Sequence, residues 1–172
     1  MSQFDAFGQD SLTKLANITY AAGANASTIQ PSTQGGVCNT ADTRNWGEPW
    51  RPPTIGTVVE CESRYPIIWA KGNFQFSSGR GQGSLLVSGD FTASGGTTFS
   101  GLILVRGSLT TTGGGIKATG AVLAYNQNGA KGTMSGSTMI QYSSCAISTV
   151  LQQLGANTPP QPVKYHAWTE MP

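Results

Sequence analysis

The segments Ile68–Phe74 (IWAKGNF), Leu85–Phe91 (LLVSGDF) and Ile103–Leu109 (ILVRGSL) are three copies of one seven-residue pattern. A weaker fourth copy, VLAYN, occupies residues 122–126. The fifth position of the copies holds Gly72, Gly89, Gly107 and Asn126, which are spaced almost evenly along the chain. A short period with one apolar run and one glycine corner is typical of a solenoid, in which each unit buries its apolar face on the next. The units are too short for helix pairs, so we predict an all-β fold, a small single-stranded β-helix with about 18 residues per rung.

Each position of the pattern has a predicted environment, because side chains alternate between the two faces of a strand. The first, third and seventh positions are apolar, and their side chains are predicted to point into the interior of the coil. The first position holds Ile68, Leu85, Ile103 and Val122, the third holds Ala70, Val87, Val105 and Ala124, and the seventh holds Phe74, Phe91 and Leu109. The fourth and sixth positions predict the solvent side: Lys71, Ser88, Arg106 and Tyr125; Asn73, Asp90 and Ser108. The glycine at the fifth position predicts a sharp corner at positive φ, which asparagine also tolerates.

The second position departs from this simple alternation. It holds Trp69, Leu86, Leu104 and Leu123, which we call the outer strip. Four large apolar side chains pointing outward form too large a patch to leave in water. One interpretation is that the N-terminal or C-terminal part of the chain covers the strip, with the segment from Asp10 to Thr57 as the expected cover. The other is that the strip binds a second subunit or a partner.

The chain is expected to form one structural domain in three parts. Residues 1–64 are expected to form an N-terminal capping helix, from Asp10 to about Asn17, followed by a loop-rich cover segment. Residues 65–142 predict the β-helix, and residues 143–172 predict a C-terminal capping helix and a tail. Short helices near both ends would seal the open ends of a solenoid.

The C-terminal helix is expected from Cys145 to Leu154, with Ser144 as its cap and Gly155 as its stop. Its apolar stripe is Ile147, Val150, Leu151 and Leu154. The tail that follows is rich in proline and then aromatic, and we expect it to fold back on the body.

The composition narrows the class of function. Charged residues make up 10% of the chain, well below the usual quarter, and the net charge is +2. So small a charge does not favour nucleic acid or an acidic membrane as a partner. The sequence has no run of about 20 apolar residues, so we do not expect these residues to insert into a membrane, and no signal peptide is recognisable after Met1.

Three cysteines allow one disulfide and leave one thiol. Cys38 and Cys61 both lie in the loop-rich segment, where a cross-link would stabilise most, whereas Cys145 is expected to be a buried free thiol. A structural metal is not expected, since the sequence has one histidine, His166, and no cysteine pair at finger spacing.

Catalysis is not expected either. Polysaccharide lyases and hydrolases built on β-helices need several carboxylates on one face, and only Asp90 lies in the repeat. Lys71, Asp90 and Arg106 come near one another across rungs, which favours a surface ion pair. Ser143 and Ser144 lack an evident, oriented base. We predict no cofactor.

Several short motifs resemble the C-terminal region of bacterial PilX-type pilus-assembly proteins. They are Gly36-Val37-Cys38, Asn45-Trp46-Gly47, Cys61 before Tyr65-Pro66-Ile67-Ile68, Gly81-Gln82-Gly83, Gly89-Asp90, Gly101 to Gly107, Tyr142-Ser143-Ser144-Cys145-Ala146 and Trp168. The resemblance covers roughly residues 36–168, and the rung pattern alone also resembles bactofilins, which are polymer-forming β-helix scaffolds. The hydrophobic pilin-like helix with which PilX-type proteins begin is not in this sequence.

The resemblance implies a right-handed coil and supports a Cys38–Cys61 disulfide. It further implies a non-catalytic structural or adhesive protein, exported to the periplasm, cell surface or exterior and associated with type IV pilus-like assembly. Its expected partners are pilus or cell-envelope proteins. The alternative implied by the bactofilins is a scaffold that self-associates by stacking rungs end to end.

Overall fold

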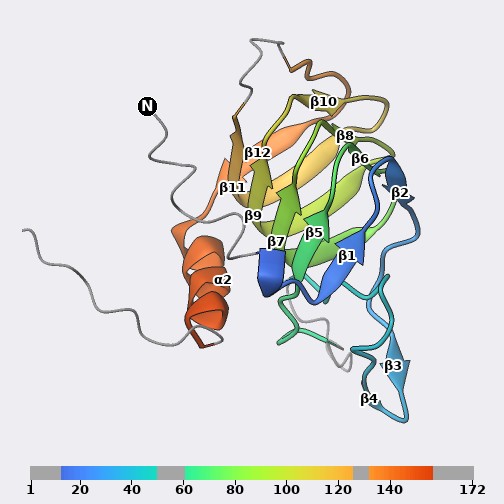
Figure 1. Cartoon of the computed structure of the whole chain (residues 1–172), viewed down its shortest axis with the longest axis vertical. Coiled ribbons are helices and arrows are strands. Elements are labelled where there is room, and N and C mark those ends of the chain that lie inside the picture. Colours follow the sequence, from blue (N-terminus) through green and yellow to red (C-terminus); the bar gives the residue numbers. More distant parts are fainter. Residues whose placement is uncertain (1–12, 50–60, 126–131, 157–172) are drawn as a thin grey trace, which may run out of the picture.

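The computed structural model describes residues 13–49, 61–125 and 132–156. Their strands form a β-solenoid of about four turns with about 19 residues per turn, which confirms the predicted fold class (Figure 1). The six-stranded sheet contains β1 (Ile18–Tyr20), β5 (Ile67–Ala70), β7 (Arg80–Val87), β9 (Thr97–Val105), β11 (Ile116–Ala124) and β12 (Met139–Tyr142), in that order. The four-stranded sheet contains β2 (Ala24–Ala26), β6 (Phe74–Phe76), β8 (Phe91–Ala93) and β10 (Leu109–Thr111). A short hairpin pairs β3 (Thr33–Gln34) with β4 (Val37–Cys38).

All neighbours in the two larger sheets are parallel, as stacked rungs require. Leu85 pairs with Ile68 on one side and with Ile103 on the other, and Ile103 pairs with Val122. The register therefore reproduces the alignment of the four sequence copies. The predicted interior columns do lie in the interior. Their members Ile68, Leu85, Val87, Phe91 and Ile103 are at most 1% exposed. In the last long strand, Val122 is half-buried and Ala124 is exposed, although both were predicted to be interior. Less of the chain covers this strand.

The solenoid begins earlier than the expected residue 65. Ile18 pairs with Ile68, and Ala24 pairs with Phe74, so β1 and β2 form a first rung. The step from this rung to the next is much longer than the later steps, because a long segment of chain separates β2 from β5. This segment includes the β3–β4 hairpin.

The corner glycines owe their place to stacking and not to positive φ, which corrects the expectation. Gly72, Gly89 and Gly107 are not among the residues at positive φ. A Cβ on Gly107 would lie 2.3 Å from the Asp90 carboxylate, and one on Gly72 would lie 2.7 Å from the Cβ of Ala22 in the first rung. Each corner glycine therefore makes room for the rung before it.

A second glycine column, in the middle of the long strands, does adopt positive φ. Gly83, Gly101 and Gly120 are in register, with φ of 115°, 132° and 131°. A Cβ on Gly101 would lie 2.1 Å from the carbonyl oxygen of Gly83, and one on Gly120 would lie 2.0 Å from that of Gly101. The long strands can change direction at this column and keep their pairing.

Helix α2 (Ser144–Ala156) packs beside the six-stranded sheet and contacts β9 and β11 (Figure 1). Its cap is Ser143 and not the expected Ser144, because the Ser143 hydroxyl accepts the N–H of Ala146 at 3.3 Å. The helix also continues through Gly155. Of the expected N-terminal helix, residues 10–12 lie outside the described residues, and Thr13 and Lys14 are helical. Residues 15–17 are not helical, so the helix ends earlier than the expected Asn17.

Candidate interaction surface

The long segment between the first two rungs is closed by a disulfide between Cys38 and Cys61, as predicted. The bond links β4 to the residues that lead back to β5, across a sequence separation of 23. Cys145 is the remaining thiol. It is exposed and not buried as expected, because it lies in the first turn of α2 on a side that the sheet does not cover.

Asn45 holds this segment together from within. Its side chain is fully buried, and its amide nitrogen lies 2.8 Å from the Asn39 carbonyl and 3.3 Å from the sulfur of Cys61. Its amide oxygen accepts the main-chain N–H of Gly47 at 3.1 Å. The hydrogen bonds of the Asn45 side chain thus stabilise the conformation of the loop.

Trp46 enters the interior of the solenoid and is completely buried. Its ring centroid lies 4.9 Å from that of Phe76 and 6.3 Å from that of Phe99. Its indole N–H donates to the Thr43 carbonyl at 3.1 Å, and its own carbonyl accepts the N–H of Gln82 at 2.9 Å. The loop therefore supplies part of the core, in the manner of a plug.

Glu48 and Arg80 form an ion pair in which the carboxylate is almost completely buried. The guanidinium Nε of Arg80 lies 2.8 and 3.0 Å from the two carboxylate oxygens of Glu48, which is 1% exposed. Arg64 donates to the Asn45 carbonyl at 2.8 Å, and burial lowers the pKa of its guanidinium. The Glu48–Arg80 pair ties the loop to β7, whereas Arg64 joins two parts of the loop, and no sequence spacing indicated either contact.

The polar residues that were weighed as catalytic candidates in the repeat make contacts that stabilise the fold. Asp90 accepts the main-chain N–H of Ser108 at 2.8 Å, and Asn73 accepts that of Asp90 at 2.9 Å. Asp90 therefore bonds along the stack, and no ion pair with Lys71 or Arg106 is seen in the described part of the chain. The ammonium of Lys71 instead lies 5.4 Å from the centre of a Trp69 ring. His166 lies outside the described residues.

Three residues of the outer strip, Trp69, Leu86 and Leu104, belong to a second apolar cluster, on the side of the six-stranded sheet away from the interior. Leu86 is buried, Trp69 and Leu104 are half-buried, and Leu123 is 53% exposed. Val150 of α2 covers the cluster together with Leu15 and Ala16. The cover thus comes from both ends of the chain, whereas we expected mainly the segment from Asp10 to Thr57.

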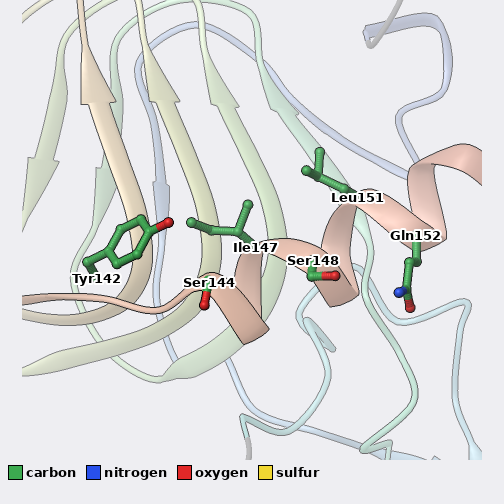
Figure 2. Close-up of a pocket in the computed structure, with 6 residues that line it drawn as sticks. All are labelled: Tyr142, Ser144, Ile147, Ser148, Leu151 and Gln152. Carbon is green, nitrogen blue, oxygen red and sulfur yellow. The ribbon is translucent and has the colours of Figure 1, made fainter.

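The exposed large apolar side chains of the described residues gather at the C-terminal end of the solenoid. Apart from Val37, they are Leu123, Tyr125, Met134, Met139, Ile140, Tyr142 and Leu151. A groove between β12 and α2 is lined by Tyr142, Ser144, Ile147, Ser148, Leu151 and Gln152. Figure 2 shows the Tyr142 ring directed toward Ile147, with Leu151 one turn further along the helix. A second hollow at this end is lined by Leu109, Val122, Met134 and Ile140, among others.

We call this end, with its two hollows, the C-terminal face. The residues that line the two hollows are apolar or uncharged, which suits binding of a protein surface better than chemistry on a small polar molecule. The sequence placed Leu123 in the outer strip, Tyr125 on the solvent side, and Ile147 and Leu151 in the apolar stripe of the helix. The exposure of Met134, Met139 and Ile140 was not predicted, because it depends on which rung is last.

Within residues 13–49, 61–125 and 132–156, no three His, Cys, Asp or Glu side chains are grouped as metal ligands would be. No helix in the same ranges is long and apolar enough to cross a membrane. Comparison of the chain with protein-family models, with curated proteins and with solved structures finds no match.

Proposed function

We propose that this protein is a non-catalytic structural or adhesive component of the bacterial cell exterior, associated with type IV pilus-like assembly. The Cys38–Cys61 disulfide is the observation that carries the proposal. Disulfides persist in oxidising compartments such as the periplasm and the cell surface, and are rare in the cytosol. The motif resemblance, which includes both cysteines, supports the pilus association.

The use of the buried polar groups supports a structural role. Asn45 shapes the loop, Glu48 pairs with Arg80, and the side chain of Gln82 donates to the Glu62 carbonyl at 2.6 Å. An active site would instead direct such groups toward a cleft that a substrate can enter. The two hollows at the C-terminal face expose mainly apolar surface, and no charged residue lines them.

Thiol trapping in the cells that naturally make the protein tests the proposal. Cells are lysed into an alkylating reagent, fractionated into periplasmic, surface and cytoplasmic material, and the protein is analysed by mass spectrometry without reduction. We expect the protein in an exported fraction, with Cys145 modified and Cys38 and Cys61 linked. A cytoplasmic protein with three modified cysteines would overturn the proposal.

A second candidate function is a self-assembling scaffold that resembles the bactofilins. The exposed apolar C-terminal face favours it, because a protein that stacks end to end must leave an end rung uncovered. Electron microscopy of the purified protein separates the two candidates. Long filaments would favour the scaffold, and discrete particles would favour the pilus-associated component.

A further inference from the structure

We infer that two copies of this protein join at their C-terminal faces, with the outer edges of their β12 strands paired antiparallel about a twofold axis. The inference goes beyond the proposed function and does not depend on the compartment in which the protein works. It concerns purified protein, so its failure and the failure of the proposed export are separate results.

The outer edge of β12 has the properties of an edge that pairs. In the described part of the chain, β12 is the last strand of its sheet, with β11 on one side. Its residues Met139, Ile140, Gln141 and Tyr142 are all exposed. Natural proteins protect such edges with charged residues or proline, and this strand has neither.

The hollow beside β12 needs an apolar cover for the same reason that each rung covers the one before it. Ile103 in β9 is buried by its neighbours on both sides, whereas Val122, its partner in the next rung, is only partly covered. Met134 and Ile140, which line the hollow, are 60% and 40% exposed. A second C-terminal face offers the same uncharged, apolar hollow and continues the stacking that holds the solenoid together.

The difference between the two ends of the solenoid favours a twofold pair over a polymer. At the first rung, Ile18 is 3% exposed and Tyr20 is half-buried, with its ring packed against Trp46 and Phe74. Among the described residues, the strands of the first rung thus contribute none of the exposed large apolar side chains. A head-to-tail polymer would place the apolar C-terminal face on this unlike surface, whereas a twofold axis pairs the face with itself.

The groove between β12 and α2 lies beside the same edge and enlarges the contact. Tyr142 is 74% exposed and Leu151 is 51% exposed. A pair of such short strands alone would be marginal, because stable interfaces bury about 800 Å² on each partner. Burial of aromatic and aliphatic side chains on both flanks of the strand supplies the additional area.

The association state of the full-length chain tests the inference. Sedimentation analysis at about 100 µM, well above a micromolar Kd, is expected to show dimers and no larger species. Ile140→Lys places a charge at the centre of the contact and is expected to weaken dimerisation at least about tenfold. Val37→Lys is the matched control, because Val37 is 70% exposed but lies on the β3–β4 hairpin, and it should leave the dimer unchanged.

A second measurement gives the symmetry and does not depend on the lysine variant folding normally. Cys145 is a native exposed thiol just after β12, so a spin label can be attached without breaking the Cys38–Cys61 disulfide. A twofold dimer is expected to give one narrow label-to-label distance, which is lost on dilution with unlabelled protein.

Three results would overturn the inference. A full-length chain that stays monomeric at about 100 µM would do so, and so would particles that grow beyond dimers with concentration. A truncation after Ala156 that dimerises while the full-length chain does not would show that residues 157–172 cover the C-terminal face instead.

Discussion

Trp46 and Gly81 share one place in the interior of the solenoid. A Cβ on Gly81 would lie 2.6 Å from the Cβ of Trp46, so the indole enters only because its neighbour in β7 has no side chain. In the following rungs the same column holds Phe99 and then Ala118. The loop residue thus takes the place that a rung residue takes elsewhere in the stack.

Gly81→Ala is therefore expected to destabilise the fold by about 1–3 kcal/mol, because an added methyl group in a packed core forces its neighbours apart. Chemical denaturation followed by circular dichroism measures the change. Gln75→Ala, at an exposed position of β6, is the control and should change stability by no more than about 0.5 kcal/mol. Equal stability of the Gly81 variant and the wild type would show that Trp46 is not held there.

Asp90→Ala is expected to cost about 0.5–1.5 kcal/mol, because the N–H of Ser108 loses its acceptor in the preceding rung. Asp90→Asn should be nearly neutral, since Asn73 performs the same task one rung earlier with an amide oxygen. Thermal unfolding of the two variants compares them. If alanine and asparagine behave alike, the bond along the stack does not stabilise the corner.

Thr97 and Thr111 are both fully buried strand residues, but only the hydroxyl of Thr111 forms hydrogen bonds among the described residues. Within the described part of the chain the hydroxyl of Thr97 has no partner, so Thr97→Val should raise stability by about 1 kcal/mol. The hydroxyl of Thr111 accepts the N–H of Ser135 at 2.9 Å, so Thr111→Val should lower stability by about 1–3 kcal/mol. The same sign for the two changes in a denaturation experiment would contradict this assignment.

Asp42 is expected to contribute to stability in a pH-dependent way. The main-chain N–H of Arg44 and the Ser32 hydroxyl donate to its carboxylate, and the first of these chiefly holds the pKa of Asp42 below its ordinary value of 3.8. A pKa that is lower in the folded than in the unfolded state gives stability that is present above the unfolded value and lost as the pH falls through the folded value. Asp42→Asn should therefore be less stable than the wild type at pH 7, with a gap that narrows below about pH 4. A gap of the same size at pH 7 and pH 3 would count against the assignment.

The double variant Cys38→Ser, Cys61→Ser is expected to lose about 3 kcal/mol, because the disulfide restricts a long loop in the unfolded chain. Cys145→Ser removes an exposed thiol and should have no measurable effect. Denaturant midpoints of the two variants provide the comparison. A double variant as stable as the wild type would mean that the bond does not hold the loop that carries Trp46.

The repeated part of the fold could be predicted because each rung repeats its own environment. Leu85 and Ile103 are buried for the same reason, and one alignment on the corner places both. The first rung was missed although Ile18, Tyr20 and Ala24 follow the apolar pattern, because it lies far before the next copy in the sequence and has Ala22 at its corner. No described strand precedes it in the sheet, so this corner can carry a side chain.

The sites could be predicted less well, because they depend on contacts between unlike segments. Nothing in the local sequence shows that Trp46 enters the interior or that Glu48 pairs with Arg80. The stripe on α2 predicted an apolar face, yet Val150 is buried while Leu151 is 51% exposed, since the helix meets the sheet along one narrow line. Exposure of β12 follows from its place at the end of the stack, which no pattern within the strand encodes.

Nuclear magnetic resonance of the labelled protein tests the stacked parallel rungs most directly. We expect cross-strand contacts between the main-chain protons of residues around Leu85 and Ile103, and around Ile103 and Val122, in the parallel pattern. Antiparallel contacts between consecutive strands, such as β9 with β10, would contradict it.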